Sequence, residues 1–202
     1  WAPGQKPLYG MVTHSSAGGL FHNMLKRAGI DQLIIDGRAD RPVRIEAVEG
    51  AVRIVDAEPN LFRDANGRAV LRTATEITDA LSAKIKGSST LCTGPAGWNL
   101  VDFACLTADY HRNFGRGGAG AVFGSKNLVA VTASGKEPVE YQDPDGFKKL
   151  GQELDQLIKA SVEDPNRTAS FRPTTGTTWW LDRAFNGRYL GQKGGYLPWH
   201  NF

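Results

Sequence analysis

The sequence predicts an α+β domain made of two similar β-sheet and helix halves. Helical and strand-like periods are mixed along the first 140 residues, and 41% hydrophobic content over 202 residues is enough for a sizeable core. An internal repeat supplies the halves: Gly18-Gly19 and Gly117-Gly118 stand 99 residues apart, and each pair leads through a short segment into an apolar strand, then Gly, a basic residue and Pro-Val. The later landmarks keep nearly the same spacing: Gly37 with Gly135, and Pro42-Val43 with Pro138-Val139. Because the same residues recur in the same order in both segments, the sequence indicates an internal duplication.

The first half contains a helix, a strand and a hairpin. The helix ends at Gly29, a natural C-cap, and the segment 31–37, DQLIIDG, is typical of a buried strand. Residues 42–55 alternate between apolar and polar side chains on either side of Glu49-Gly50, which predicts a hairpin. The apolar face of the helix consists of Leu20, Phe21, Met24, Leu25 and Ala28.

The second half follows a polar loop at 56–68. Apolar residues at helical spacing predict a helix over about 69–86, and short strands are expected at 89–93 and 103–107, on either side of the turn GPAGWN. The stretch TADYHRNFG before the next glycines is a poor strand, whereas LVAVTA, from Leu128, is strand-like. The helical positions are Val70, Ala74, Ile77, Leu81 and Ile85.

The character of the chain changes at Tyr141. Asp143-Pro144 fits an N-cap followed by proline at the first helical position, and an amphipathic helix should reach about Val162. Residues 163–202 are polar, glycine-rich and aromatic, which is typical of a connection that packs on further domains. We therefore expect one domain over 1–140, and over 141–202 a helix and connecting segment whose exposed tryptophans belong to an interface.

Residues 111–130 hold the densest cluster of glycines and basic side chains. Glycines let a backbone approach a ligand with its N–H groups, and arginines suit phosphate or another oxyanion, so the pattern predicts an anion-binding loop. The alternative is an ordinary glycine-rich turn with solvated arginines. Gly18 and Gly19 stand at the start of the first helix, where an anion is also favoured. The cluster comprises Gly115, Gly117, Gly118, Gly120, Gly124, Arg112, Arg116 and Lys126.

The two familiar nucleotide motifs fit this loop badly. The Walker pattern needs Gly-Lys-Ser/Thr, but the order here is Gly124-Ser125-Lys126. The Rossmann pattern needs G-x-G-x-x-G, whereas Gly118, Gly120 and Gly124 are spaced G-x-G-x-x-x-G.

Composition excludes several other classes. A net charge of +3 gives no reason to expect nucleic acid or an anionic membrane, and no apolar run is long enough to span a membrane. The two cysteines, Cys92 and Cys105, are best interpreted as buried thiols of a protein in a reducing compartment, and too few to hold a four-cysteine cluster. With no signal peptide, a cytoplasmic location is expected.

Residues 111–131 resemble HRxxGRGGxGAVxGSKNLKA, a signature of the tungsten-dependent aldehyde:ferredoxin oxidoreductase family. Three further stretches are similar to that family: 94–101, GPAGWNLV, with Trp98 in place of its usual Glu; 18–43, GGLFHNMLKRAGIDQLIIDGRADRPV; and 195–202, GYLPWHNF. The stretches resemble the N-terminal domain of the family, and we expect this chain to lack the start of that domain. The resemblance implies a domain of two facing halves that forms the base for a bis-pterin metal cofactor.

The resemblance implies a site. The cofactor holds tungsten or molybdenum through two pterins, and a magnesium ion bridges their phosphates with help from backbone carbonyls, which here belong to Ser16 and Gly117. Arg116 is the best candidate for a side-chain contact with the cofactor, while Lys126 and Asn127 are better candidates for holding the loop. The implied cofactor-binding residues are Ser16, Ala17, Gly18, Gly19, Arg116, Gly117, Gly118 and Gly120.

The resemblance also implies an activity. The expected enzyme oxidises aldehydes to carboxylic acids and passes electrons through a 4Fe-4S cluster, held by a part of the polypeptide outside this chain, to ferredoxin or a similar carrier. Further expected partners are the remaining domains of the enzyme and a second copy of the polypeptide in a homo-oligomer. No catalytic residue is assigned within the chain. The alternatives are the same cofactor acting on another substrate, such as an aromatic thioester, or a cofactor-free module that binds phosphate or nucleotide.

Overall fold

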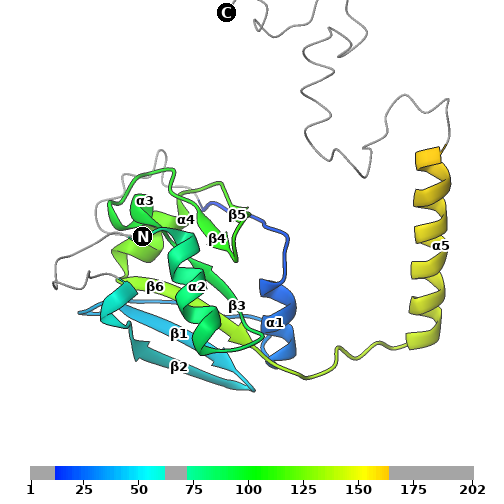
Figure 1. The fold of residues 1–202 in the computed structure, drawn as a ribbon, viewed down its shortest axis with the longest axis horizontal. Coiled ribbons are helices and arrows are strands. Elements are labelled where there is room, and N and C mark those ends of the chain that lie inside the picture. The colour runs from blue at the N-terminus through cyan, green and yellow to red at the C-terminus, as the bar shows by residue number, and fades with distance from the viewer. Residues whose placement is uncertain (1–11, 62–71, 164–202) are drawn as a thin grey trace, which may run out of the picture. The chain divides into compact units, whose positions relative to one another are not determined.

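The computed structural model describes residues 12–61 and 72–163 of the chain (Figure 1). The chain divides into two compact units, residues 1–139 and 140–202. Of the helices within the described ranges, none is long and apolar enough to cross a membrane.

A mixed six-stranded sheet organises the first unit. The strands are β1 (Val43–Val48), β2 (Ala51–Asp56), β3 (Ser89–Cys92), β4 (Leu106–Ala108), β5 (Arg112–Phe114) and β6 (Leu128–Ser134). Their order is β2-β1-β6-β3-β4-β5, in which β1 and β6 are parallel and every other neighbouring pair is antiparallel. The central strand β6 is buried along nearly its whole length, because side chains cover both of its faces.

Two apolar clusters lie on the two faces of this sheet. One includes Phe21 of α1 (Phe21–Arg27) and Phe123 of α4 (Ala119–Ser125) with Ile45 and Val131. The other includes Ile77 and Leu81 of α2 (Ala74–Lys84), together with Leu61 of the short helix η1 (Pro59–Leu61). Trp98, at the end of α3 (Pro95–Trp98), packs against this second cluster. The sheet is therefore covered by side chains on both faces. The loops that precede α1 and α4 are not part of it.

The predicted hairpin and helices are confirmed. Glu49 and Gly50 both have positive φ, 49° and 80°, which is the turn geometry that joins tightly twisted antiparallel strands. The first helix ends before Gly29, whose φ is 77°. The helix predicted over 69–86 is α2; Thr73 caps it by accepting a hydrogen bond from the Glu76 N–H, and the Glu76 carboxylate accepts one from the Thr73 N–H. The predicted helical position Val70 lies outside the described residues.

Two predictions of strands were wrong. Residues 31–37 have the apolar composition of a strand but form none, because they have no neighbouring strand within the described part of the chain. Conversely, the stretch TADYHRNFG, interpreted as a poor strand, lies in the β4–β5 hairpin, where antiparallel pairing compensates for its polar composition.

The fold is mixed α+β, as predicted, but the described residues form one sheet and not two separate halves. Both copies of the sequence repeat contribute to that sheet. The first copy supplies β1 and β2, and the second supplies β6.

The second unit contains the predicted amphipathic helix α5 (Pro144–Glu163). Asp143 caps it, since its Oδ1 accepts a hydrogen bond from the Gly146 N–H at 2.9 Å. Tyr141 stacks on Phe147 with 4.4 Å between the ring centroids. The apolar face of α5 is exposed and comprises Phe147, Leu150, Leu154, Leu157 and Ile158. Residues 164–202, with the predicted interface tryptophans, lie outside the described residues.

Candidate cofactor-binding site

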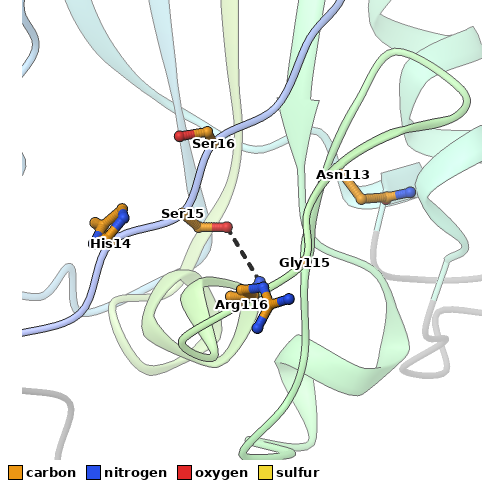
Figure 2. A pocket seen from close by; sticks show the side chains of 6 residues that line it. All are labelled: His14, Ser15, Ser16, Asn113, Gly115 and Arg116. Carbon is orange, nitrogen blue, oxygen red and sulfur yellow. Dashed lines mark hydrogen bonds between the residues drawn. The ribbon is translucent and has the colours of Figure 1, made fainter.

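A pocket of about 430 Å³ lies between two loops that are about 100 residues apart in the sequence. Figure 2 shows His14, Ser15 and Ser16 on one loop and Gly115 and Arg116 on the other, with Asn113 nearby. The first loop precedes α1, and the second joins β5 to α4. The fold therefore brings the starts of the two sequence repeats to one place.

The two loops run side by side in opposite directions. At one end, a Cβ built on Gly117 would lie only 2.8 Å from Thr13 Cγ2. In the middle, the Arg116 N–H donates a hydrogen bond to Ser15 Oγ at 3.1 Å (Figure 2). At the other end, a Cβ on Gly19 would lie 2.9 Å from Arg112 Cγ. We call this antiparallel contact between residues 13–19 and 112–117 the loop seam.

The second loop has a conformation that favours glycine. Gly117 and Gly118 have φ of 78° and 70°, in the left-handed region that side chains disfavour. Gly118 is buried and forms the N-cap of α4, and its carbonyl accepts hydrogen bonds from Ala121 and Val122. The double glycine thus turns the chain from the pocket directly into a buried helix.

Close packing holds α4 in place. A Cβ on Gly120 would lie 2.9 Å from the Ala104 carbonyl carbon, and one on Gly124 would lie 2.7 Å from the Gly97 carbonyl carbon. Both glycines are buried because the backbones of neighbouring segments occupy the space of a side chain. These glycines serve packing, away from the pocket.

Lys126 and Asn127 connect the end of α4 to the chain that follows α1. Lys126 Nζ donates a hydrogen bond to the Gly37 carbonyl at 2.8 Å, and Asn127 Nδ2 donates one to the Ala39 carbonyl at 2.7 Å. The Ala39 N–H in turn donates to the Lys126 carbonyl. These hydrogen bonds agree with the interpretation that both side chains hold the loop.

The predicted site residues do not all line the pocket. Ser16 and Arg116 line the pocket, and Gly117 and Gly19 lie in the loop seam. Gly18 has open space where a Cβ would project. Gly118 and Gly120 are buried in or at the start of α4 and do not line the pocket. Ala17 is half-buried between Ser16 and Gly18.

Four pocket residues are absent from the implied cofactor-binding residues: His14, Ser15, Asn113 and Gly115. Gly115 belongs to the recognised glycine-rich stretch, so the motif itself could have indicated it. Ser15 acts through a hydrogen bond to a residue 101 positions away, which no local pattern reveals. His14 is exposed at this pocket.

The groups at the pocket fit an anionic ligand with a hard cation. The Arg116 side chain is exposed and has no ion pair or hydrogen bond with the described residues, so its guanidinium is free to bind an oxyanion. The carbonyls of Ser16 and Gly117 accept no hydrogen bond from the described part of the chain, and carbonyl oxygens suit magnesium. Within the same residues no group of three or more His, Cys, Asp or Glu side chains could hold a metal ion. A metal bound here would thus depend on backbone carbonyls and on oxygens of the ligand.

The two cysteines differ in their surroundings. Cys92 is fully buried on β3, and burial raises the pKa of its thiol to about 12. Cys105 is half-buried, and its thiol is 3.7 Å from Asn113 Oδ1. The prediction of a buried thiol is therefore confirmed for Cys92, whereas the thiol of Cys105 is only partly buried.

Comparison with known proteins identifies the class. The family model described as "Aldehyde ferredoxin oxidoreductase, N-terminal domain" matches residues 3–135. The chain therefore belongs to the aldehyde ferredoxin oxidoreductase family, and the matched part corresponds to the N-terminal domain of that family.

Two relatives show how much of such an enzyme is covered. The chain is 39% identical over 150 residues to the tungsten-containing aldehyde ferredoxin oxidoreductase of Pyrococcus furiosus, a match that spans 74% of this chain and 24% of the relative. It is 36% identical over 155 residues to the enzyme of the same name from Pyrococcus abyssi, spanning 77% of this chain and 24% of the relative. The chain thus spans about a quarter of the length of these curated relatives.

A solved structure is similar in fold. It is described as the active site complex BamBC of benzoyl coenzyme A reductase in complex with 1,5-dienoyl-CoA. The TM-score is 0.68 with 26% sequence identity, and the match covers 78% of this chain and 23% of the other. The same fold is thus found in an oxidoreductase whose described ligand is a coenzyme A thioester.

Proposed function

We propose that this chain is the base that holds a tungsten or molybdenum bis-pterin cofactor in a cytoplasmic enzyme that oxidises aldehydes to carboxylic acids. The observation that carries the proposal is the loop seam, because it brings two glycine-containing loops to one pocket with a free arginine. Membership of the aldehyde ferredoxin oxidoreductase family supports the same conclusion.

The geometry also supports an internal duplication behind this site. Helices α1 and α4 each have seven residues, 21–27 and 119–125, and a shift of 98 residues superimposes their numbering. The same shift relates Gly29 to Asn127, and both have positive φ just after their helix, 77° and 55°. The end contacts of the loop seam, Thr13 with Gly117 and Arg112 with Gly19, exchange under a shift of 98 or 99 residues. This pattern is what two copies related by a pseudo-two-fold axis would produce.

Each element of the site has a role in the proposal. The carbonyls of Ser16 and Gly117 would hold a magnesium ion together with phosphate oxygens of the cofactor. Gly18 and Gly19, with Ala17, give the first loop the narrow backbone that lets the ligand approach, and Arg116 offers paired donors to a phosphate. Gly118 and Gly120 lie behind the second loop, where they fix the start of α4. When bound, the metal centre supplies the redox chemistry, while these residues orient it. The chain contributes position and charge, and no catalytic residue is assigned to it.

The remaining components belong to the rest of the enzyme. A 4Fe-4S cluster, ferredoxin or a similar electron acceptor, the domains that close over the base and any homo-oligomer contact are part of this proposal. Their support is the length of the curated relatives, about three quarters of which lies outside the matched region.

A second candidate keeps the fold and the cofactor but changes the substrate to an aromatic thioester. It is favoured by the likeness to the benzoyl coenzyme A reductase complex. Substrate choice in such enzymes depends on residues that approach the metal centre from outside the base. The two candidates therefore predict the same cofactor and differ only in the substrate assay.

The test is elemental analysis of the natural polypeptide purified from its host, combined with fluorescence of the oxidised pterin released on denaturation. We expect about one tungsten or molybdenum and two pterins per polypeptide. Dye reduction dependent on an aldehyde would then select the first candidate, and dye reduction dependent on an aromatic thioester the second. Protein that carries neither metal nor pterin but binds a nucleotide stoichiometrically would overturn the proposal in favour of a phosphate-binding module.

A further inference from the structure

The β4–β5 hairpin carries the second loop of the pocket. Asn113 lies in β5, Gly115 and Arg116 follow that strand directly, and all three line the pocket. The hairpin stands at the end of the sheet, where β5 has no further neighbour among the described residues (Figure 1). Each of its strands has three residues, and β4 pairs with β3 at only two positions. A hairpin attached by so short a ladder needs further contacts to hold its loop in one place.

Asp109 makes such contacts at the turn between β4 and β5. Its backbone N–H donates a hydrogen bond to the Thr90 carbonyl at 2.7 Å, and its own carbonyl accepts one from Thr78 Oγ1 at 3.0 Å. Its carboxylate accepts a hydrogen bond from the Thr90 N–H at 3.1 Å and another from Ser89 Oγ, which lies 2.8 Å from each carboxylate oxygen. Every polar group of Asp109 is thus bonded to β3 or to α2.

The partners of Asp109 belong to the core. Thr78, Ser89 and Thr90 are each 1% exposed or less. Among the described residues the Asp109 carboxylate forms no ion pair, so neutral donors alone hold it. Because its donors are a buried hydroxyl and a strand N–H, the carboxylate fixes the hairpin turn to the start of β3.

The backbone of Asp109 is in a conformation that favours glycine. Its φ is 55°, in the left-handed region, which aspartate tolerates better than most side chains do. A side chain that is fully bonded at such a position indicates that the turn depends on that side chain. Glu49 provides a contrast, since it has a similar φ of 49° at the turn of the β1–β2 hairpin, but its side chain is exposed.

We propose that Asp109 is a positioning residue of the cofactor site, whose carboxylate holds the β4–β5 hairpin where Arg116 meets Ser15. The part that concerns the cofactor rests on the proposed function. The loop seam itself does not, because the Arg116 N–H donates to Ser15 Oγ without any ligand, and a hairpin that moves relative to β3 would break that bond. Asp109 does not line the pocket, so it acts through the loop and does not touch the ligand.

Hydrogen–deuterium exchange on the 202-residue chain tests the positioning role in the absence of cofactor. Asp109→Gly removes the carboxylate and relieves the left-handed backbone at the same time. We expect the amides of residues 112–116 to exchange about 10-fold faster or more, while those of β6 change by less than about 3-fold. Asp109→Asn should restore slow exchange, because the asparagine oxygen can accept from the Thr90 N–H and its amide group can donate to Ser89 Oγ.

The matched control is Glu49→Gly, which makes the same backbone change at the other hairpin and should leave the exchange of residues 112–116 unaffected. Unchanged exchange of 112–116 in Asp109→Gly would overturn the proposal, because the carboxylate would then not hold the hairpin. An equal rise in β6 would also overturn it, since the effect would be a general loss of stability and not a local one. A rise of the same size in Glu49→Gly would lead to the same conclusion.

Retention of metal and pterin by the natural enzyme during dialysis connects Asp109 to the ligand. Asp109→Gly should retain the cofactor about 10-fold less well than the wild type, whereas Asp109→Asn and Glu49→Gly should retain it nearly as well. Full retention by Asp109→Gly, together with faster exchange of residues 112–116, would overturn the role in the cofactor site. A wild-type enzyme without metal or pterin would overturn the proposed function itself, and the exchange measurements would still decide whether Asp109 holds the loop seam.

Discussion

Thr13 occupies the space into which a side chain at Gly117 would project. A Cβ built on Gly117 would lie 2.8 Å from Thr13 Cγ2, and the φ of Gly117 is 78°. Two requirements, a left-handed backbone and a close neighbour from the other loop, thus coincide at one residue of the loop seam. Gly18, on the other loop, has open space where a Cβ would project.

Gly117→Ala should therefore destabilise the chain by about 1 to 2 kcal/mol, through backbone strain and displacement of Thr13. Gly18→Ala is the matched control and should change the free energy of unfolding by less than about 0.5 kcal/mol. Urea unfolding followed by circular dichroism measures both. Equal effects of the two substitutions would show that the loop seam is not closely packed in solution.

Gly124→Ala should destabilise the chain more strongly, by about 2 to 3 kcal/mol. The new methyl group would meet the backbone of Gly97, which cannot move without displacing α3. Gly151→Ala is the helical control: nothing lies within 4 Å of its Cβ, and alanine favours helix, so a gain of up to about 1 kcal/mol is expected for α5. Thermal unfolding distinguishes the two, and a neutral Gly124→Ala would refute the contact between α3 and α4.

Arg116→Gln tests the anion site without disturbing the fold. Because the side chain is exposed and makes no ion pair or hydrogen bond with the described residues, stability should change by less than about 0.5 kcal/mol. Loss of a charge-assisted pair with a phosphate should weaken cofactor binding about 10- to 100-fold.

Retention of metal and pterin during dialysis of the natural enzyme is the measurement for Arg116. The matched control is Arg53→Gln, at an exposed arginine on the edge strand β2. If Arg116→Gln retains the cofactor as well as Arg53→Gln does, Arg116 has no part in the site.

The ion pairs around Arg44 predict a dependence of stability on pH. Burial alone would raise the pKa of Glu58, but hydrogen bonds from Arg44 and Lys84 lower it from its ordinary 4.5 to about 2. Since the folded pKa lies below the unfolded one, Glu58 contributes stability that is fully present above about pH 4.5 and is lost as the pH falls towards 2.

Glu58→Gln should accordingly cost about 1 to 2 kcal/mol at pH 7, a figure reduced for solvent screening of this partly exposed group. The difference from the wild type should shrink as the pH falls from 4.5 to 2. Denaturant unfolding at several pH values measures it. A difference that stays constant over that range would rule out titration of Glu58 as the cause.

Local chemistry made part of the fold predictable. Glu49-Gly50 identified a hairpin, and Gly29 marked the end of a helix, because each depends on a few neighbouring residues. The segment 31–37 was predicted as a strand from its composition, but a strand also needs a neighbour, and composition does not say whether one is present. The β4–β5 hairpin shows the opposite case, since pairing there overrides a polar sequence.

The candidate site was predictable in outline for a similar reason. The family resemblance implied that Ser16 and Arg116 belong to one cofactor site, and both line one pocket. Ser15 was not predictable, because its role depends on a hydrogen bond to the backbone of Arg116 across 101 positions. Gly120 resembled a ligand-binding glycine, yet its neighbours are the backbone atoms of residues 104 and 105, which only the packed structure reveals.

The loop seam also has a consequence for the order of events during synthesis. Ser16 leaves the ribosome 100 residues before Arg116, an interval of about 5 to 20 seconds at ordinary translation rates. Throughout that time the first loop exists without its partner, and the pocket has only one wall. A ligand that needs both loops can therefore be captured only after the chain has been made through Gly117, which excludes cofactor insertion into a nascent chain that carries the first loop alone.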